Sequence, residues 1–84
     1  MARSQEEIYN GVVSIISKHA KNQEALTGIS GDTSILKDLQ VNSARLVDIV
    51  LEFEDEFDLE ISDDELDNIN TVGDAVSLVG KLLN

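Results

Sequence analysis

The feature that most constrains this chain is a one-sided apolar stripe along residues 46–57. Its apolar side chains recur every three or four positions, at Leu46, Ile49, Val50, Phe53 and Phe57. This spacing places them on one face of a helix, whose opposite side is almost wholly acidic. Such a helix is stable only if its apolar face packs against other elements, so the stripe predicts a helical bundle.

A longer helix is predicted near the start of the chain, from about Ser4 to Ala20. Ser4 followed by Glu7 fits a capping box, in which each residue satisfies a backbone N–H of the other. The buried face of this helix is expected to comprise Ile8, Val12, Ile15 and Ile16. Basic residues near its end, at Lys18, His19 and Lys21, complement the negative end of the helix dipole.

Two further helices are predicted in the last third of the chain. Ser62 and Glu65 suggest a second capping box at a short helix, anchored by Leu66 and Ile69. Thr71 is expected to cap the last helix. The apolar face of that helix is predicted to comprise Val72, Ala75, Val76, Val79, Leu82 and Leu83.

Residues 21–41 show no sustained helical pattern, so we expect a long first loop. The segment Asp32-Thr33-Ser34-Ile35-Leu36 could cap a single turn there, with Ile35, Leu36 and Leu39 fixing the loop to the core. The predicted fold is therefore all-α. It is a small four-helix bundle with three longer helices, one short helix and a long first loop, forming one domain over residues 1–84.

Composition narrows the classes of function. The 84 residues contain no cysteine, which excludes a disulfide, a thiol nucleophile and a thiolate metal site within the chain. No apolar run is long enough to span a membrane, and residues 1–10 do not resemble a signal peptide. We therefore expect a cytoplasmic protein without membrane insertion.

The charge is strongly negative and unevenly distributed. The net charge is −11, and residues 46–80 contain twelve acids but no lysine or arginine. Such a field repels nucleic acid and attracts basic protein surfaces. A basic partner surface is the functional interpretation, and the alternative is that the acidity only keeps a small domain in solution.

No metal site or catalytic centre is predicted. Asp63, Glu65, Asp67 and Asp74 fall at positions 1, 3, 5 and 12 of a possible calcium loop, but Asn68 stands where that loop needs glycine. No nucleophile and base can be paired, so we do not expect an enzyme. The single histidine, His19, lies at a helix end, where a structural role is expected.

Ser43 stands where the acidic helix should begin. Helix starts carry unpaired backbone N–H groups and the positive end of the dipole, so a phosphate esterified to this serine would be favoured there. A serine at a helix start also commonly acts only as a cap.

The chain resembles the acyl carrier protein family in three places. Residues 51–65 resemble the acidic second helix of that family and the turn after it, and residues 70–76 resemble the start of its last helix. Asp32-Thr33-Ser34 and Lys37-Asp38-Leu39 resemble the end of its long first loop. The resemblance implies that Ser43 carries 4′-phosphopantetheine, attached by a phosphopantetheinyl transferase from coenzyme A with Mg²⁺. The thiol of this arm would hold acyl groups as thioesters for fatty-acid, lipid or polyketide-type biosynthesis.

Further roles are implied by the same resemblance. Asp48, Glu54 and Asp55 would dock on basic surfaces of acyl-transferring and acyl-modifying enzymes, and the carrier is expected to be a monomer. Seven positions that periodicity assigns to the core would also shelter the acyl chain: Leu46, Val47, Val50, Phe53, Ala75, Val76 and Val79.

Four residues around the serine depart from the family pattern. Asn42 replaces the usual aspartate, Ala44 replaces a larger apolar residue, Arg45 adds a positive charge, and Gln40 stands where glycine is frequent. These departures suggest a specialised carrier for a dedicated pathway. The alternative is an acidic interaction module that keeps the fold without being modified, and that scaffolds or regulates a basic partner.

Overall fold

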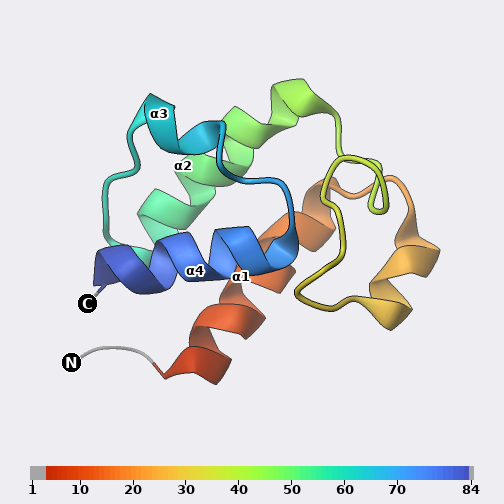
Figure 1. Cartoon of the computed structure of the whole chain (residues 1–84), viewed down its shortest axis with the longest axis horizontal. Helices are drawn as coiled ribbons and strands as arrows, with labels where there is room; N and C mark the ends of the chain where they lie inside the picture. The colour runs from red at the N-terminus through yellow and green to blue at the C-terminus, as the bar shows by residue number, and fades with distance from the viewer. Residues whose placement is uncertain (1–3, 84) are drawn as a thin grey trace.

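Three longer helices pack around one core in the computed structural model, which describes residues 4–83 (Figure 1). They are α1 (Gln5–His19), α2 (Leu46–Phe57) and α4 (Val72–Leu83), and the short α3 (Asp63–Leu66) connects α2 to α4. The described residues contain no strand, only one isolated antiparallel bridge between Ser34 and Thr71. The prediction of an all-α bundle with a long first loop is confirmed.

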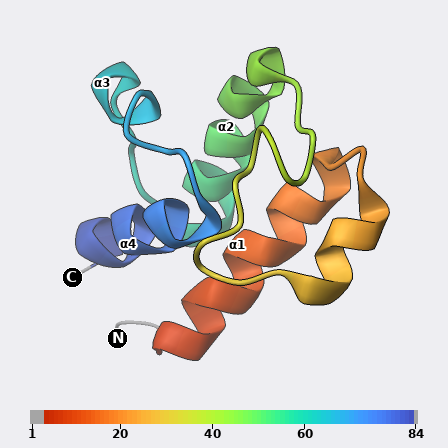
Figure 2. The ribbon, with the colours of Figure 1, turned by 45° about the vertical axis from the view of Figure 1, so that its right-hand side comes forward.

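The core lies where α1, α2 and α4 face one another (Figure 2). Each fully buried aliphatic or aromatic side chain stabilises the fold by roughly 1.5–3 kcal/mol. The largest of these side chains are Phe53, Ile8, Ile16, Ile35, Leu39, Ile49, Val12, Val72 and Val79. All three predicted apolar stripes contribute to this set, and the first loop adds Ile35 and Leu39.

The start of α1 has the predicted capping box. The Ser4 hydroxyl accepts a hydrogen bond from the Glu7 N–H at 3.2 Å, and the Glu7 carboxylate accepts one from the Ser4 N–H at 3.3 Å. Gly11, which weakens the helix in isolation, leaves room for an aromatic ring: a Cβ there would lie 2.7 Å from Cζ of Phe57. Packing of α2 against α1 therefore accounts for this glycine.

The first loop contains more regular structure than the sequence predicted. A 3₁₀ helix, η1 (Gln23–Gly28), follows α1. A single turn then forms at residues 34–39, where the Ser34 hydroxyl accepts the Lys37 N–H at 3.1 Å, so the cap comes from Ser34, within the predicted segment. Ile35 and Leu39 are buried as predicted, but Leu36 is 38% exposed. The prediction for Leu36 was wrong because adjacent residues in a helical turn point in different directions, and Ile35 and Leu39 take the buried side.

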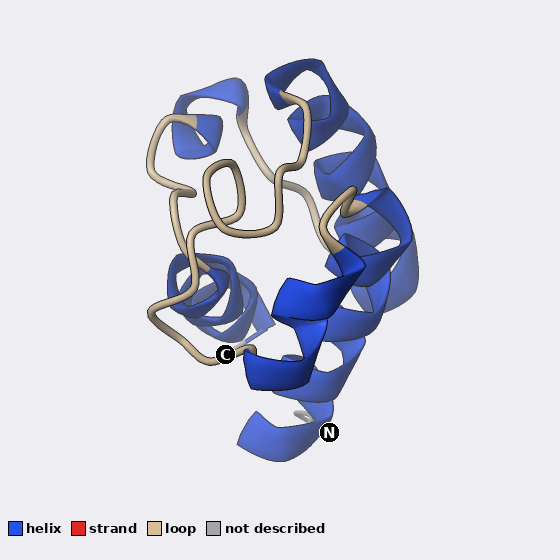
Figure 3. Cartoon of the chain, turned by 90° about the vertical axis from the view of Figure 1, so that its right-hand side faces the viewer, coloured by secondary structure: helices blue, strands red, loops and turns tan. Residues whose placement is uncertain are grey.

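The first loop passes beside α4 (Figure 3), and main-chain hydrogen bonds fasten it to the start of that helix. The Ile35 N–H donates to the Asn70 carbonyl and the Val72 N–H to the Thr33 carbonyl, both at 3.0 Å. The Gly73 N–H donates to the Gly31 carbonyl at 2.8 Å. A Cβ on Gly73 would lie 2.8 Å from the same Gly31 oxygen, so this approach requires glycine.

Of the caps predicted for the last two helices, one is confirmed and the other is wrong. The Thr71 hydroxyl accepts the Asp74 N–H at 3.1 Å, and the Asp74 carboxylate accepts the Thr71 N–H at 3.1 Å, which confirms the predicted cap. The Ser62 side chain makes no capping bond, so the predicted box with Glu65 is wrong. Instead the Glu65 N–H donates to the Ser62 main-chain carbonyl at 3.0 Å, as in a single turn.

The buried face of α4 also differs in detail. Leu78 is buried although it was not predicted, and Leu82 is 40% exposed although it was. Leu82 lies on the same face as Ala75 but in the last turn, where its neighbour Leu83 is the residue half-buried against the core.

Candidate functional site

Ser43 is the first residue of a short 3₁₀ turn, η2 (Ser43–Arg45), which leads directly into α2. Asn42 caps this turn: its side-chain oxygen accepts the Ala44 N–H at 2.9 Å and its main-chain carbonyl accepts the Arg45 N–H at 2.8 Å. The Leu46 N–H then donates to the Ser43 carbonyl. The prediction of a helix start at Ser43 was correct, with one 3₁₀ turn preceding the α-helix.

The Ser43 side chain is exposed, and its hydroxyl has no hydrogen-bond partner within residues 4–83. The cap is supplied by Asn42, so Ser43 is not occupied as a capping residue. The N–H groups of residues 44, 45 and 46 are all satisfied inside the turn. A phosphate on Ser43 would therefore depend on nearby side chains for its counter-charge more than on these amides.

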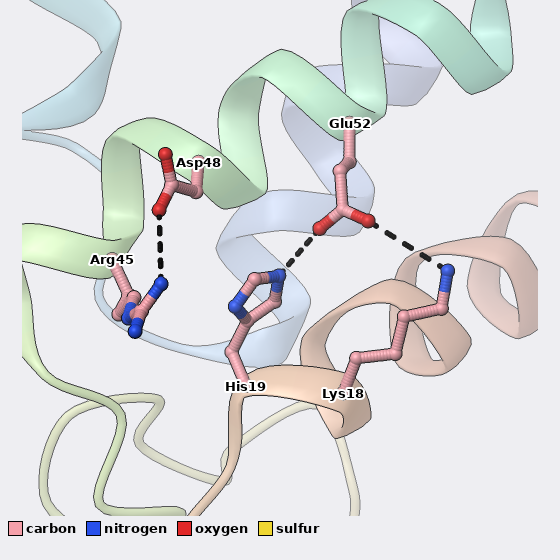
Figure 4. Close-up of polar contacts among 5 residues, drawn as sticks. All are labelled: Lys18, His19, Arg45, Asp48 and Glu52. Carbon is pink, nitrogen blue, oxygen red and sulfur yellow. Dashed lines mark hydrogen bonds and ion pairs between the residues drawn. The ribbon is translucent and has the colours of Figure 1, made fainter.

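The three acids of α2 that were predicted to dock have different environments. Asp48 is exposed, with its carboxylate 3.4 Å from the Arg45 guanidinium (Figure 4). Asp55 is also exposed. Glu54 is half-buried, and its carboxylate accepts the Ile61 N–H at 2.6 Å. This bond holds the connection between α2 and α3, a structural role that the sequence did not indicate.

Glu52, which the sequence analysis did not single out, links α2 to the end of α1. Its carboxylate bonds to Nε2 of His19 and lies 3.7 Å from Nζ of Lys18 (Figure 4). The hydrogen bond from His19 lowers the pKa of Glu52 below its usual value of 4.5, helped by the charges of His19 and Lys18 and opposed by partial burial. His19 thus has a structural contact, as predicted for it.

The seven candidate acyl-lining residues do not all lie in the core. Val50, Phe53, Ala75, Val76 and Val79 are buried, and Leu46 is half-buried against them. Val47 is 51% exposed, so its assignment to the core was wrong. It shares the outer face of α2 with Leu51, four residues later, which is 55% exposed.

A hollow with a basic lining lies beside Ser43. It is formed by the end of α1 and by the turn that contains Ser43, and its lining residues are Lys18, His19, Ala20, Lys21, Asn42 and Arg45. The sequence analysis assigned the α1 residues only to the helix dipole. The available signal was the absence of basic residues from positions 46–80, which concentrates positive charge in the first half of the chain.

The described residues provide no alternative centre. Among them no group of three or more histidine, aspartate or glutamate side chains could hold a metal ion. No helix within residues 4–83 is long and apolar enough to cross a membrane.

Comparison with known proteins decides the family. Residues 12–79 match the family model described as the phosphopantetheine attachment site. The acyl carrier protein of Lactobacillus acidophilus is 41% identical over 76 residues, which cover 90% of this chain and 92% of that protein. This chain belongs to the acyl carrier protein family.

Other relatives agree with this assignment. The acyl carrier protein of Thermotoga maritima is 40% identical over 80 residues, covering 95% of this chain and 96% of that protein. The solved structure of acyl carrier protein from Enterococcus faecalis superposes with a TM-score of 0.78 at 35% identity, covering 95% of this chain and 99% of that one. The chain is thus a carrier of acyl intermediates on phosphopantetheine, and members of this family are carriers rather than catalysts.

Proposed function

We propose that Ser43 is the residue that carries the 4′-phosphopantetheine arm. The observation that supports this most directly is the exposed Ser43 hydroxyl, free of partners within residues 4–83, in the turn before the acidic helix α2. Ser43 also lies inside the segment that matches the attachment-site family. The residues present fit the group, because a primary hydroxyl can form the phosphodiester and Arg45 lies two positions away to offset its charge.

In this proposal the chain supplies the hydroxyl that accepts the arm, and a phosphopantetheinyl transferase catalyses the attachment. When the arm is attached, the Ser43 hydroxyl loses its proton and bonds to the phosphorus of the pantetheine phosphate, and the adenosine bisphosphate part of coenzyme A leaves. No base within residues 4–83 is hydrogen-bonded to Ser43, so a phosphopantetheinyl transferase must provide one. The thiol of the attached arm supplies the sulfur that a chain without cysteine lacks.

We further propose that the exposed side of α2 docks on basic surfaces of the transferase and of acyl-transferring and acyl-modifying enzymes. Asp48 and Asp55 are exposed there, and Glu54 lies beside them with part of its carboxylate bonded to Ile61. The net charge of −11 supports attraction to such surfaces. Asn42 and Arg45 favour a dedicated pathway of fatty-acid, lipid or polyketide-type biosynthesis. The monomeric state, the absence of an activity of its own and the cytoplasmic location stay predictions of the sequence.

The test is the intact mass of the protein after incubation with coenzyme A, Mg²⁺ and a broad-specificity phosphopantetheinyl transferase. We expect a gain of one phosphopantetheine in the wild type and none in Ser43→Ala. Ser62→Ala is the matched control, because Ser62 is also an exposed serine at a helix start without a side-chain cap bond. This variant should be modified like the wild type.

A wild type that gains no mass with several transferases would contradict the proposal. Ser43 would then be an ordinary residue of the turn, and the chain would act as the unmodified acidic interaction module. Modification that persists in Ser43→Ala would instead place the arm on another residue.

A further inference from the structure

The basic hollow beside Ser43, lined by Lys18, His19, Ala20, Lys21, Asn42 and Arg45, is unusual in a chain of net charge −11. Three of the six lysine and arginine residues of the sequence line it, together with the only histidine. The lining contains no acid. The hollow is therefore suited to an anion, whereas most of the remaining surface repels one.

Ser43 does not line this hollow itself, but it stands between two residues that do. Asn42, which directly precedes it, and Arg45, two residues after it, both belong to the lining. The bonds from the Ala44 and Arg45 N–H groups to Asn42 fix the turn that joins them. A phosphate esterified to the Ser43 hydroxyl lies only one bond beyond that oxygen, so it is attached to a residue with a lining residue directly before it and another two positions after it.

Two of the cations are available to a phosphate. Lys18 and His19 already share the Glu52 carboxylate. Lys21 is exposed and has no ion pair within residues 4–83. Arg45 pairs with Asp48 at 3.4 Å, but side-chain exposures of 62% and 51% make that pair weak, so Arg45 can exchange Asp48 for a phosphate at little cost.

The hydrogen-bond donors available to this phosphate are mainly side chains. The N–H groups of residues 44, 45 and 46 are satisfied within the turn, so these three amides of the helix start are already engaged. Charge-assisted hydrogen bonds from lysine and arginine are the remaining strong donors for a phosphate oxygen.

We propose that the basic hollow holds the phosphodiester group of the arm, with Lys21 and Arg45 as its direct partners. The arm then leaves the surface over the end of α1 and not along the acidic side of α2. This inference rests on Ser43 as the attachment residue.

The test compares amide ¹H–¹⁵N spectra of the protein before and after loading of Ser43, with mass spectrometry confirming the loading. In the wild type we expect chemical-shift changes at residues 18–21 as well as around Ser43. The changes at residues 18–21 should be lost in Lys21→Gln and should shrink when sodium chloride is raised, because salt screens an exposed ionic contact. Lys37→Gln is the matched control, since Lys37 is exposed, carries the same charge and does not line the hollow.

Changes confined to the neighbours of Ser43 in a fully loaded protein would overturn the inference while leaving Ser43 as the attachment residue. If the protein cannot be loaded, both Ser43 as the attachment residue and the role of the hollow are contradicted. A third spectrum, of the unloaded protein with inorganic phosphate, separates the sources of the anion. Perturbation of residues 18–21 by free phosphate but not by loading would mean that the hollow binds an anion other than the arm.

Discussion

At the scale of single residues, the main chain is most constrained just before the site. Gln40 and Asp58 have φ angles of 56° and 53°, in the left-handed region. Asp58 ends α2, and aspartate tolerates this conformation comparatively well. Gln40 has no such advantage, and it stands where the acyl carrier family often has glycine. Its conformation directs the chain into the turn at Asn42 and Ser43.

We predict that Gln40→Gly stabilises the protein. A left-handed conformation costs a residue with a Cβ roughly 1–2 kcal/mol, whereas the added freedom of an unfolded glycine costs roughly 0.5–1 kcal/mol. The free energy of unfolding should therefore rise by about 0.5–1 kcal/mol in urea titrations. Gln40→Ala, which keeps the Cβ, should change it little. A glycine variant less stable than the alanine variant would show that Gln40 is unstrained.

At the scale of elements, the contact between the first loop and α4 depends on the absence of a side chain at Gly73. A Cβ there would lie 2.8 Å from the main-chain oxygen of Gly31, and backbone cannot move aside as a flexible side chain can. A Cβ on Gly80, in the same helix, would lie 3.9 Å from Ile8 Cδ1, which is ordinary van der Waals contact.

The two glycines of α4 should therefore respond in opposite directions to alanine. Gly73→Ala should lower the free energy of unfolding by roughly 1–3 kcal/mol, the usual cost of forcing extra atoms into a packed contact. Gly80→Ala should leave it unchanged or raise it by up to about 1 kcal/mol, because alanine favours helix. Thermal and urea unfolding of both variants provide the measurement. Equal changes in the free energy of unfolding would mean that close packing of the first loop on α4 does not require glycine at position 73.

The link from Glu52 to α1 should appear in the pH dependence of stability. The pKa of Glu52 is lowered in the folded protein, so its contribution is present above the usual value of 4.5 and is lost as the pH falls through the folded pKa. Glu52→Gln should cost about 0.5 kcal/mol at neutral pH, since the side chain is more than a third exposed, and the cost should fade in acid.

The control for Glu52→Gln is Asp55→Asn, which removes an exposed charge from the same helix. Asp55 has no ion pair within residues 4–83, so its loss should not reproduce the acid-dependent difference. A cost of Glu52→Gln that stays constant from neutral pH to pH 3 would contradict a role for the His19 contact.

The helices could be predicted because their apolar residues repeat over several turns. Phe53, Val76 and Val79 are buried as that repeat requires. Residues at the edge of a stripe are different, because the position of the neighbouring helix decides their burial. Val47 was predicted buried and is exposed, and Leu78 was not predicted and is buried. The 3₁₀ helix η1 has too few residues for a periodic signal.

Parts of the site depend on contacts that no local pattern encodes. The place of Ser43 at the start of α2 could be predicted because it depends on the local sequence. The basic hollow forms only when the end of α1 meets a turn more than twenty residues later in the sequence. The bond from Glu54 to the Ile61 N–H likewise follows from the path of the chain after α2.

At the scale of the whole molecule, charge is divided around Ser43. Residues 46–80 carry twelve acids and no lysine or arginine, whereas the hollow at the end of α1 is basic. A partner that approaches Ser43 meets both signs of charge. Electrostatic complementarity of this kind affects association rate and partner choice more than final affinity.

Charge reversal on α2 should therefore slow loading by the transferase. Asp55→Lys should lower kcat/KM several-fold at low salt while the helical circular dichroism stays unchanged, and the effect should shrink in high salt. Asp67→Lys is the matched control, because it makes the same change in net charge at an exposed residue at the end of α3. Equal slowing in both variants would mean that net charge alone controls the rate. No slowing in Asp55→Lys would contradict docking through α2.

Carriage of acyl groups by this chain depends on attachment of the arm to one residue, Ser43. Fragmentation mass spectrometry of peptides from the loaded protein tests it most directly, because it locates the added group along the chain. We expect phosphopantetheine on Ser43 and on no other serine or threonine. Finding the group on a different residue, or finding none after exposure to several transferases, would contradict it.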